Sequence, residues 1–252
     1  MIDQQTLIEL CRPLYPTDPF FRPFICRGAL DSVQIAVVGA NPATPIPSSH
    51  SSTDNRSACK YSLEDYASRL LNYTHFHNMY ADIRYVSKGK PAPIFGKSLK
   101  STRDKVFRLV SEIEKERHVS VLETNVNAFP TKNEEEFDAV ARARPDILKR
   151  GSEVFVEVVN SFQPRLFIAH GARAIVAVQS LTSVKWQNHT PDPWSVVKAN
   201  FPRPITLSRG SYSNRNETVV IGCYHFTNRE RGFEFEKLVK QLVGITQLEL
   251  RN

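Results

Sequence analysis

The sequence predicts an α/β fold, a three-layer α/β/α sandwich with a central, mainly parallel four-stranded sheet. Four short runs of β-branched and other apolar residues are typical of strands buried on both faces. They lie at residues 33–38, 119–123, 166–169 and 218–222. Stretches with helical periodicity lie between and after these runs, and such alternation favours a parallel sheet covered on both sides.

The helical stretches have apolar residues that repeat every three or four positions. One begins after Ser62 and another after Ser101, and both serines suit the N-cap position of a helix. A third begins at Pro145, since proline suits the first helical position. We expect a short fourth helix at residues 172–180 and a last one around Leu238.

Two stretches rich in serine or proline, residues 44–55 and 183–215, are expected to be long loops. Loops of this length in a compact domain are usually functional or disordered. The chain shows no internal repeat and no break in composition, so we expect a single domain over residues 1–252.

Composition narrows the class of protein. The formal net charge of +7 favours a polyanionic partner, because contacts with phosphates release condensed counterions. We see no signal peptide and no apolar run long enough to span a bilayer, so we expect a cytoplasmic protein without a membrane segment. We also expect the protein to be a monomer. The cysteines lack the spacing of a metal site and are expected to be buried thiols: Cys11, Cys26, Cys59 and Cys223.

Polar residues follow each of the four expected strands, at the end where open parallel sheets bind their ligands. Residues 39–43 (Gly-Ala-Asn-Pro-Ala) follow the first strand and residues 124–127 (Thr-Asn-Val-Asn) follow the second. His170 and Gly171 follow the third, and residues 223–229 (Cys-Tyr-His-Phe-Thr-Asn-Arg) follow the fourth. Two amides and two imidazoles should therefore meet in one crevice.

These four segments, in this order, resemble motifs of the uracil-DNA glycosylase superfamily. Residues 39–43 resemble the first motif, Gly-x-Asp/Asn-Pro-x, and residues 122–126 resemble the strand end whose Asn reads the flipped base. Residues 164–172 are similar to the third strand, and residues 224–228 stand where the family has His-Pro-Ser or His-Pro-Ala. The resemblance implies a monofunctional DNA glycosylase that flips a base out of double-stranded DNA and hydrolyses its N-glycosidic bond.

The resemblance also implies roles for individual residues. Asn41 would position the attacking water, Asn125 would read the base, and His225 would stabilise the departing base. His170 is expected to support its loop rather than to react. The remaining site candidates are Gly39, Ala43 and Asn127 for base binding, with Asn127 as a rival reader, and Arg215, Asn228, Arg229 and Arg231 for DNA binding.

The identity of the base stays open at this point. In the branch strictest for uracil a Tyr stands at the position of Ala43, so Ala43 should leave room for a bulky 5-substituent. Glucosylated hydroxymethylcytosine in phage DNA, the target of an antiviral defence, would fit such a pocket, with aromatic residues between 61 and 95 along its wall. The alternatives are a repair glycosylase for uracil or hydroxymethyluracil and a non-catalytic DNA-binding module.

No cofactor or metal is expected. Residues 96–98 (Gly-Lys-Ser) lack the upstream glycine of a phosphate-binding P-loop. His75 and His77 have no third ligand in view, and Cys11 and Cys26 are too far apart to match the iron–sulfur branches of the superfamily.

Overall fold

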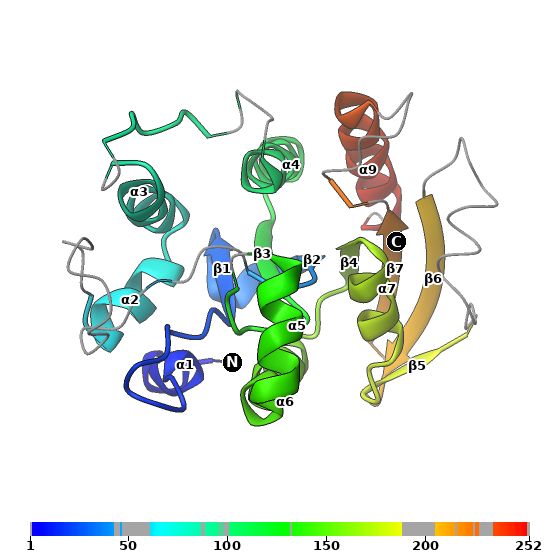
Figure 1. Ribbon diagram of the computed structural model, residues 1–252. Helices are drawn as coiled ribbons and strands as arrows, with labels where there is room; N and C mark the ends of the chain where they lie inside the picture. Colours follow the sequence, from blue (N-terminus) through cyan, green and yellow to red (C-terminus); the bar gives the residue numbers. More distant parts are fainter. Residues whose placement is uncertain are drawn as a thin grey trace.

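The chain forms a mixed α/β structure around one seven-stranded sheet. The computed structural model describes residues 2–42, 46, 61–86, 89–95, 97, 101–131, 133–187, 205–214, 216–223, 225–226 and 234–250. Across the sheet the strands run in the order β1-β3-β2-β4-β7-β6-β5 (Figure 1). The strands are β1 (Phe24–Arg27), β2 (Val33–Gly39), β3 (Ser120–Asn125), β4 (Leu166–His170), β5 (Val184–Trp186), β6 (Ile205–Tyr212) and β7 (Glu217–Cys223).

The four expected strands are present as β2, β3, β4 and β7, and they are neighbours in the middle of the sheet. They pair in parallel, in the order β3-β2-β4-β7. Their residues are buried almost without interruption, as strands covered on both faces require. The edges are antiparallel: β1 pairs with β3, β6 with β7, and β5 with β6.

The expected four-stranded sheet is therefore too small, because three antiparallel strands extend the parallel centre to seven strands. Two of them, β5 and β6, lie inside the stretch 183–215 that was expected to be a loop. In β6 buried residues alternate with exposed ones, and β1 and β5 have four and three residues. A strand with one exposed face carries polar residues at every second position, so β6 lacks the continuous apolar run that marks a central strand, and the two edge strands, β1 and β5, are too short to show a pattern.

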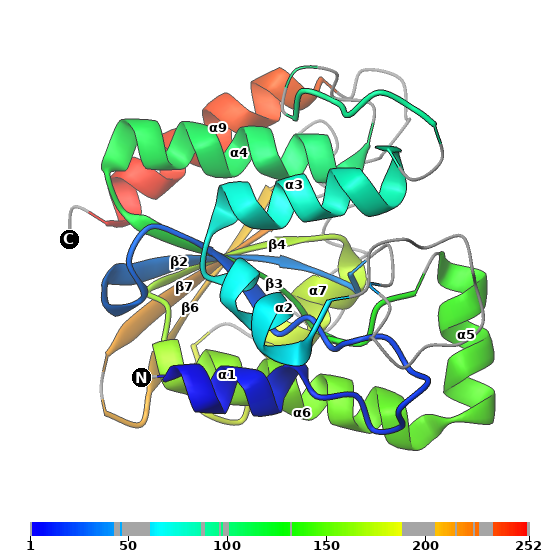
Figure 2. The same ribbon diagram turned by 90° about the vertical axis from the view of Figure 1, so that its left-hand side faces the viewer.

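Helices cover both faces of the sheet. Figure 2 shows α3, α4 and α9 above the sheet and α1 and α6 below it. The helices of the described residues are α1 (Gln4–Cys11), α2 (Leu63–Leu70), α3 (Tyr73–Arg84), α4 (Thr102–Arg117), α5 (Glu134–Ala143), α6 (Pro145–Phe162), α7 (Ala172–Gln179) and α9 (Phe235–Glu249), with a 3-10 turn at Leu30–Ser32. No helix of the described residues is long and apolar enough to span a membrane.

The expected helix starts are confirmed at three positions. Ser62 caps α2, Ser101 caps α4, and Pro145 is the first residue of α6. The apolar stripe of α6 faces the core through Val154, Phe155 and other residues. Three helices were not expected, namely α1, α3 and α5.

Three of the four cysteines, Cys11, Cys26 and Cys223, are buried free thiols, and Cys59 lies outside the described residues. Burial raises the pKa of each of the three thiols, so they stay protonated at neutral pH.

The N-terminus of α4 carries a reciprocal cap that can be tested. Ser101 Oγ accepts a hydrogen bond from the Asp104 backbone N–H at 3.1 Å and donates one to Asp104 Oδ2 at 2.8 Å. We expect Ser101→Ala to lower the free energy of unfolding by about 1 kcal/mol, whereas Ser101→Thr, which keeps the hydroxyl, should retain most of it. Urea unfolding followed by circular dichroism measures both, and an unchanged midpoint in Ser101→Ala would show that the cap contributes nothing.

Candidate functional site

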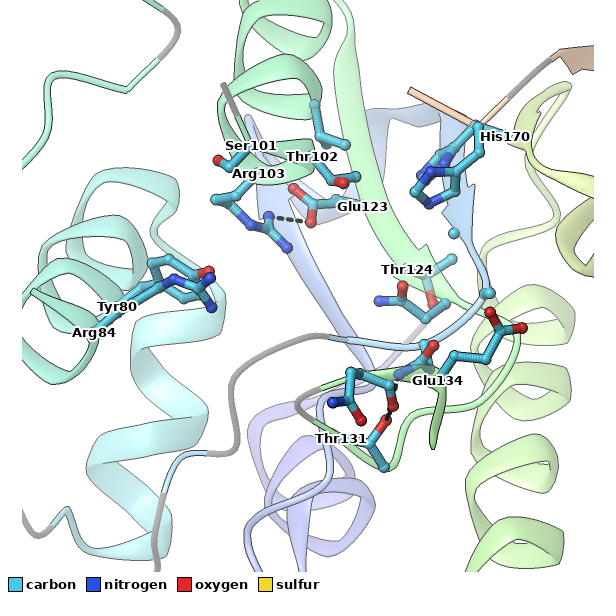
Figure 3. Close-up of a pocket in the computed structure, with 17 residues that line it drawn as sticks. Tyr80, Arg84, Ser101, Thr102, Arg103, Glu123, Thr124, Thr131, Glu134 and His170 are labelled. Carbon is cyan, nitrogen blue, oxygen red and sulfur yellow. Dashed lines mark hydrogen bonds and ion pairs between the residues drawn. The ribbon is translucent and has the colours of Figure 1, made fainter. Parts of the chain in front are cut away.

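A pocket of about 230 Å³ opens at the carboxyl ends of the parallel strands (Figure 3). All four parallel strands contribute, through their last residues or the residues that follow them, and α3, α4 and α5 supply the other walls. The lining residues are Gly39, Ala40, Asn41, Tyr80, Arg84, Ser101, Thr102, Arg103, Val106, Glu123, Thr124, Asn125, Thr131, Asn133, Glu134, His170 and His225.

Three strand ends form a row along one side of this pocket. Gly39 pairs with Asn125 across β2 and β3, and on the other side Gly39 lies one residue beyond the Val38–Ala169 pair, next to His170. A Cβ atom on Gly39 would stand 2.7 Å from Asn125 Oδ1 and 3.0 Å from His170 Nε2. Both side chains therefore converge above Gly39, and only glycine leaves room for them.

Asn41 is held by a short chain of hydrogen bonds. Thr131 Oγ1 donates to the carbonyl oxygen of Asn133 at 3.2 Å and accepts from Asn41 Nδ2 at 2.6 Å. Because a carbonyl oxygen can only accept, the Thr131 hydroxyl proton points to Asn133, and the atom of Asn41 next to Thr131 must be the donor. The Oδ1 atom of Asn41 therefore remains available to accept a hydrogen bond from a water molecule in the pocket.

Two histidines line the pocket side by side. The rings of His170 and His225 lie 5.2 Å apart, and His170 also stacks on Phe226 with centroids 4.3 Å apart. Lys105 of α4 donates to the carbonyl oxygen of Phe226 and so ties the segment after β7 to the helix. Burial, followed by the nearby positive charge of Lys105, lowers the pKa of His225, so at neutral pH this imidazole is uncharged and carries a single ring proton.

A buried ion pair forms another part of the wall. Arg103, in the first turn of α4, contacts the Glu123 carboxylate on β3, and their side chains are only 11% and 6% exposed. Tyr73 donates a hydrogen bond to the other oxygen of Glu123 at 3.4 Å. Glu123 and Asn125 are two residues apart on one strand, so both point to the same face of the sheet. The charge of this carboxylate is thus compensated inside the pocket.

The wall opposite His170 comes from α3. Figure 3 shows Tyr80 and Arg84 across the pocket from His170, with Arg103 and Glu123 between them. The guanidinium groups of Arg84 and Arg103 lie 5.9 and 5.7 Å from the Tyr80 ring centre. Of the described aromatic residues between 61 and 95 that were expected along a pocket wall, only Tyr80 is in the lining. The others are core residues or pack against the core: Tyr61, Tyr66, Tyr73, Phe76, Tyr85 and Phe95.

The structure brings four of the predicted site residues together and separates one. Gly39, Asn41, Asn125 and His225 all line the pocket. Asn127 does not: its Nδ2 donates to Leu148 O at 2.7 Å and to Ser152 Oγ at 3.2 Å, and its Oδ1 accepts from the Phe129 N–H at 3.0 Å. The predicted residues Ala43, Arg215, Asn228, Arg229 and Arg231 lie outside the described residues.

Sequence reasoning missed several lining residues. Arg103 and Thr131 are not part of any sequence motif. Arg103 lies on a helix and Thr131 in a loop, and only the tertiary fold brings these segments to the pocket. Tyr80 and Arg84 lie four residues apart on α3, and a helical reading of residues 73–84 would have put them on one face. In the described part of the chain, no three His, Cys, Asp or Glu side chains group together as metal ligands would.

Asn125, the last residue of β3, and Asn127, two residues beyond it, should respond differently to truncation. Asn127 is 4% exposed and has three hydrogen bonds, so Asn127→Ala leaves several buried polar groups unpaired and should cost about 2–4 kcal/mol of unfolding free energy. The side-chain amide of Asn125 has no hydrogen bond to any described residue, so we expect Asn125→Ala to change stability by less than about 0.5 kcal/mol. Urea unfolding of both variants tests this contrast, and equal losses would contradict it.

Comparison with known proteins assigns no family to this chain, so the functional proposal below is argued from the geometry of the pocket. The chain matches no protein-family model and no curated protein.

Proposed function

We propose that the chain is a monofunctional DNA glycosylase with the three-layer α/β/α fold of the uracil-DNA glycosylase superfamily. One observation carries the proposal: Asn41, Asn125 and His225, from three separate segments, line a single pocket at the carboxyl ends of the parallel strands. These are the residues to which the resemblance assigns water positioning, base reading and leaving-group stabilisation. The net charge of +7 supports a nucleic-acid partner.

The chemistry of these side chains suits hydrolysis of a bond between a sugar and a base. In the transition state positive charge grows on the sugar and negative charge on the departing base. With its Nδ2 bound to Thr131, Asn41 offers Oδ1 to orient the attacking water. His225 is neutral, so its single N–H can donate to the base, and that hydrogen bond strengthens as the base becomes negative. The nucleotide must leave the duplex to enter such a pocket.

The substrate we propose is a pyrimidine with a bulky polar 5-substituent, such as glucosylated hydroxymethylcytosine in phage DNA. Tyr80, Arg84 and Arg103 support this choice, because they form a polar and aromatic wall across the pocket from His170. Hydroxyl groups of a sugar substituent can accept hydrogen bonds from guanidinium groups and pack against an aromatic ring. Uracil and hydroxymethyluracil carry no sugar substituent of this kind.

A panel of oligonucleotides tests the proposed activity. The protein is incubated with glucosylated phage DNA and with duplexes that contain uracil, hydroxymethyluracil or hydroxymethylcytosine, and alkali then reveals abasic sites. We expect excision, fastest on the glucosylated DNA, and a loss of on the order of a hundredfold or more in Asn41→Ala and His225→Ala. His75→Ala is the control, because His75 is exposed on α3 and does not line the pocket.

The outcomes of the panel separate the alternatives. Faster excision of uracil than of the glucosylated base would overturn the bulky substrate and favour a repair glycosylase. Binding to modified DNA without any abasic sites would replace the enzyme by a DNA-binding module. Normal rates in Asn41→Ala or His225→Ala would remove that residue from the mechanism.

Thr131 is expected to act on the reaction through Asn41. Thr131→Val keeps the shape of the side chain but removes the hydroxyl that fixes the Asn41 amide, so the attacking water loses its orientation. We expect the single-turnover rate to fall by about ten- to a hundredfold while the affinity for substrate DNA stays the same. Thr131→Ser, which restores the hydroxyl, should recover most of the rate. A parallel loss of affinity and rate in both variants would indicate a general distortion instead.

A further inference from the structure

His170 is a buried polar side chain that the proposed mechanism leaves unused. It ends β4, is 5% exposed, and lines the pocket next to His225. Its Nδ1 atom is buried and has no hydrogen-bond partner among the described residues, and its Nε2 atom points to the space above Gly39 where Asn125 also converges. Burial holds the pKa of His170 well below its ordinary value, and the repulsion that a protonated His225 would add and the charge of Arg103 act in the same direction, so the ring is neutral.

A neutral imidazole has one N–H, and the surroundings decide which nitrogen carries it. A buried N–H without an acceptor is rare in proteins, while a buried acceptor without a donor is less costly. Because Nδ1 of His170 is buried and no described residue accepts a hydrogen bond from it, the proton belongs on Nε2, which faces the pocket.

A second buried histidine shows the opposite arrangement. His77 on α3 has its Nδ1 atom 2.7 Å from the carbonyl oxygen of Tyr73, which can only accept, so in His77 the proton belongs on Nδ1. His77 is 2% exposed and does not line the pocket. Burial, followed by the charge of Arg103, lowers the pKa of His77 to about 3, so this ring is neutral as well. His77 is therefore a matched internal reference for His170.

We propose that His170 contacts the substrate directly: its Nε2–H donates a hydrogen bond to a carbonyl oxygen of the base while the Asn125 amide pairs with the neighbouring position. The two groups approach the same point above Gly39 from the strands on either side of β2: a Cβ atom on Gly39 would lie 3.0 Å from His170 Nε2 and 2.7 Å from Asn125 Oδ1. Together they offer an imidazole N–H and an amide that can both accept and donate, which matches the alternating C=O and N–H edge of a pyrimidine.

This inference deepens the proposed glycosylase function and rests on it. The pocket would hold two neutral imidazoles, His170 and His225, on the departing base. Each donates a hydrogen bond that strengthens as negative charge grows on the base. His170 is then a second catalytic residue, and its stacking on Phe226 holds the ring in place.

The first experiment examines the ring nitrogens of the free protein. Nitrogen-15 NMR of labelled histidines between pH 7.5 and 6 should show His170 as the neutral Nε2–H form and His77 as the neutral Nδ1–H form. Addition of uracil, 5-hydroxymethyluracil or 5-hydroxymethylcytosine as soluble probes should shift the Nε2 signal of His170 and leave His77 unchanged. A charged or Nδ1–H form of His170, or no response to any of the three bases, overturns the proposal.

The second experiment compares substitutions that mimic different parts of the ring. His170→Phe keeps the ring and its stacking on Phe226 but removes the N–H. We expect single-turnover excision by His170→Phe to fall by about a hundredfold, the effect of removing one donor to a developing negative charge. A Gln amide places its nitrogen near the position of Nε2, and an Asn amide near that of Nδ1. His170→Gln should therefore recover part of the rate, and His170→Asn should not. His77→Phe is the control for replacement of a buried histidine and should excise at the wild-type rate.

The two proposals fail in different ways. If the wild-type protein excises a base and His170→Phe keeps its rate, the role of His170 is overturned and the glycosylase function stands. If no base is excised but the Nε2 signal of His170 responds to one of the free bases, the enzymatic function fails and the base contact stands. Equal recovery by Gln and Asn would overturn the assignment of the proton to Nε2.

Discussion

The register of the four parallel strands is the constraint on which the candidate site depends. Hydrogen bonds between β3, β2 and β4 place Asn125, Gly39 and His170 side by side at one edge of the sheet. Gly39 has no side chain, and that absence lets the two flanking side chains lean toward each other. A register shift of one residue on either strand would turn one of them to the opposite face. The buried core of the central strands therefore determines which polar groups meet.

The buried ion pair between Arg103 and Glu123 is a second constraint, and it joins the helical layer to the sheet. Desolvation of two charges is costly, so such a pair is poor evidence of added stability, whereas the loss of one partner would leave an uncompensated charge. Here the pair joins the first turn of α4 to β3 inside the pocket. Lys105, two residues further along α4, holds the segment that carries His225 through the Phe226 carbonyl. The N-terminal end of α4 thus positions two walls of the pocket, one through Arg103 and one through Lys105.

Hydrogen-bond partners distinguish Asn127 from Asn125 and His170. Both polar atoms of the Asn127 side chain have partners within the described structure, and Asn127 lies outside the pocket lining. Asn125 and His170 lie in the lining, where their side chains have no hydrogen bond to a described residue. Since buried polar groups are normally paired, one that borders a cavity without a protein partner is a place where water or a ligand can bind.

The sequence by itself determined the parallel centre of the sheet. A strand that is buried on both faces is apolar along its whole length, and a helix that is buried on one face is apolar at every third or fourth position, so both can be recognised from the sequence. It also determined that Gly39, Asn41, Asn125 and His225 would share one crevice, since carboxyl ends of parallel strands lie at the same edge. Only the tertiary structure decided between Asn125 and Asn127, which are two residues apart and chemically identical. The chain bends after β3, and α6 supplies partners to Asn127 alone. Arg103, Thr131 and Tyr80 likewise became pocket residues only in three dimensions, because each comes from a segment whose local pattern carries no information about where it packs.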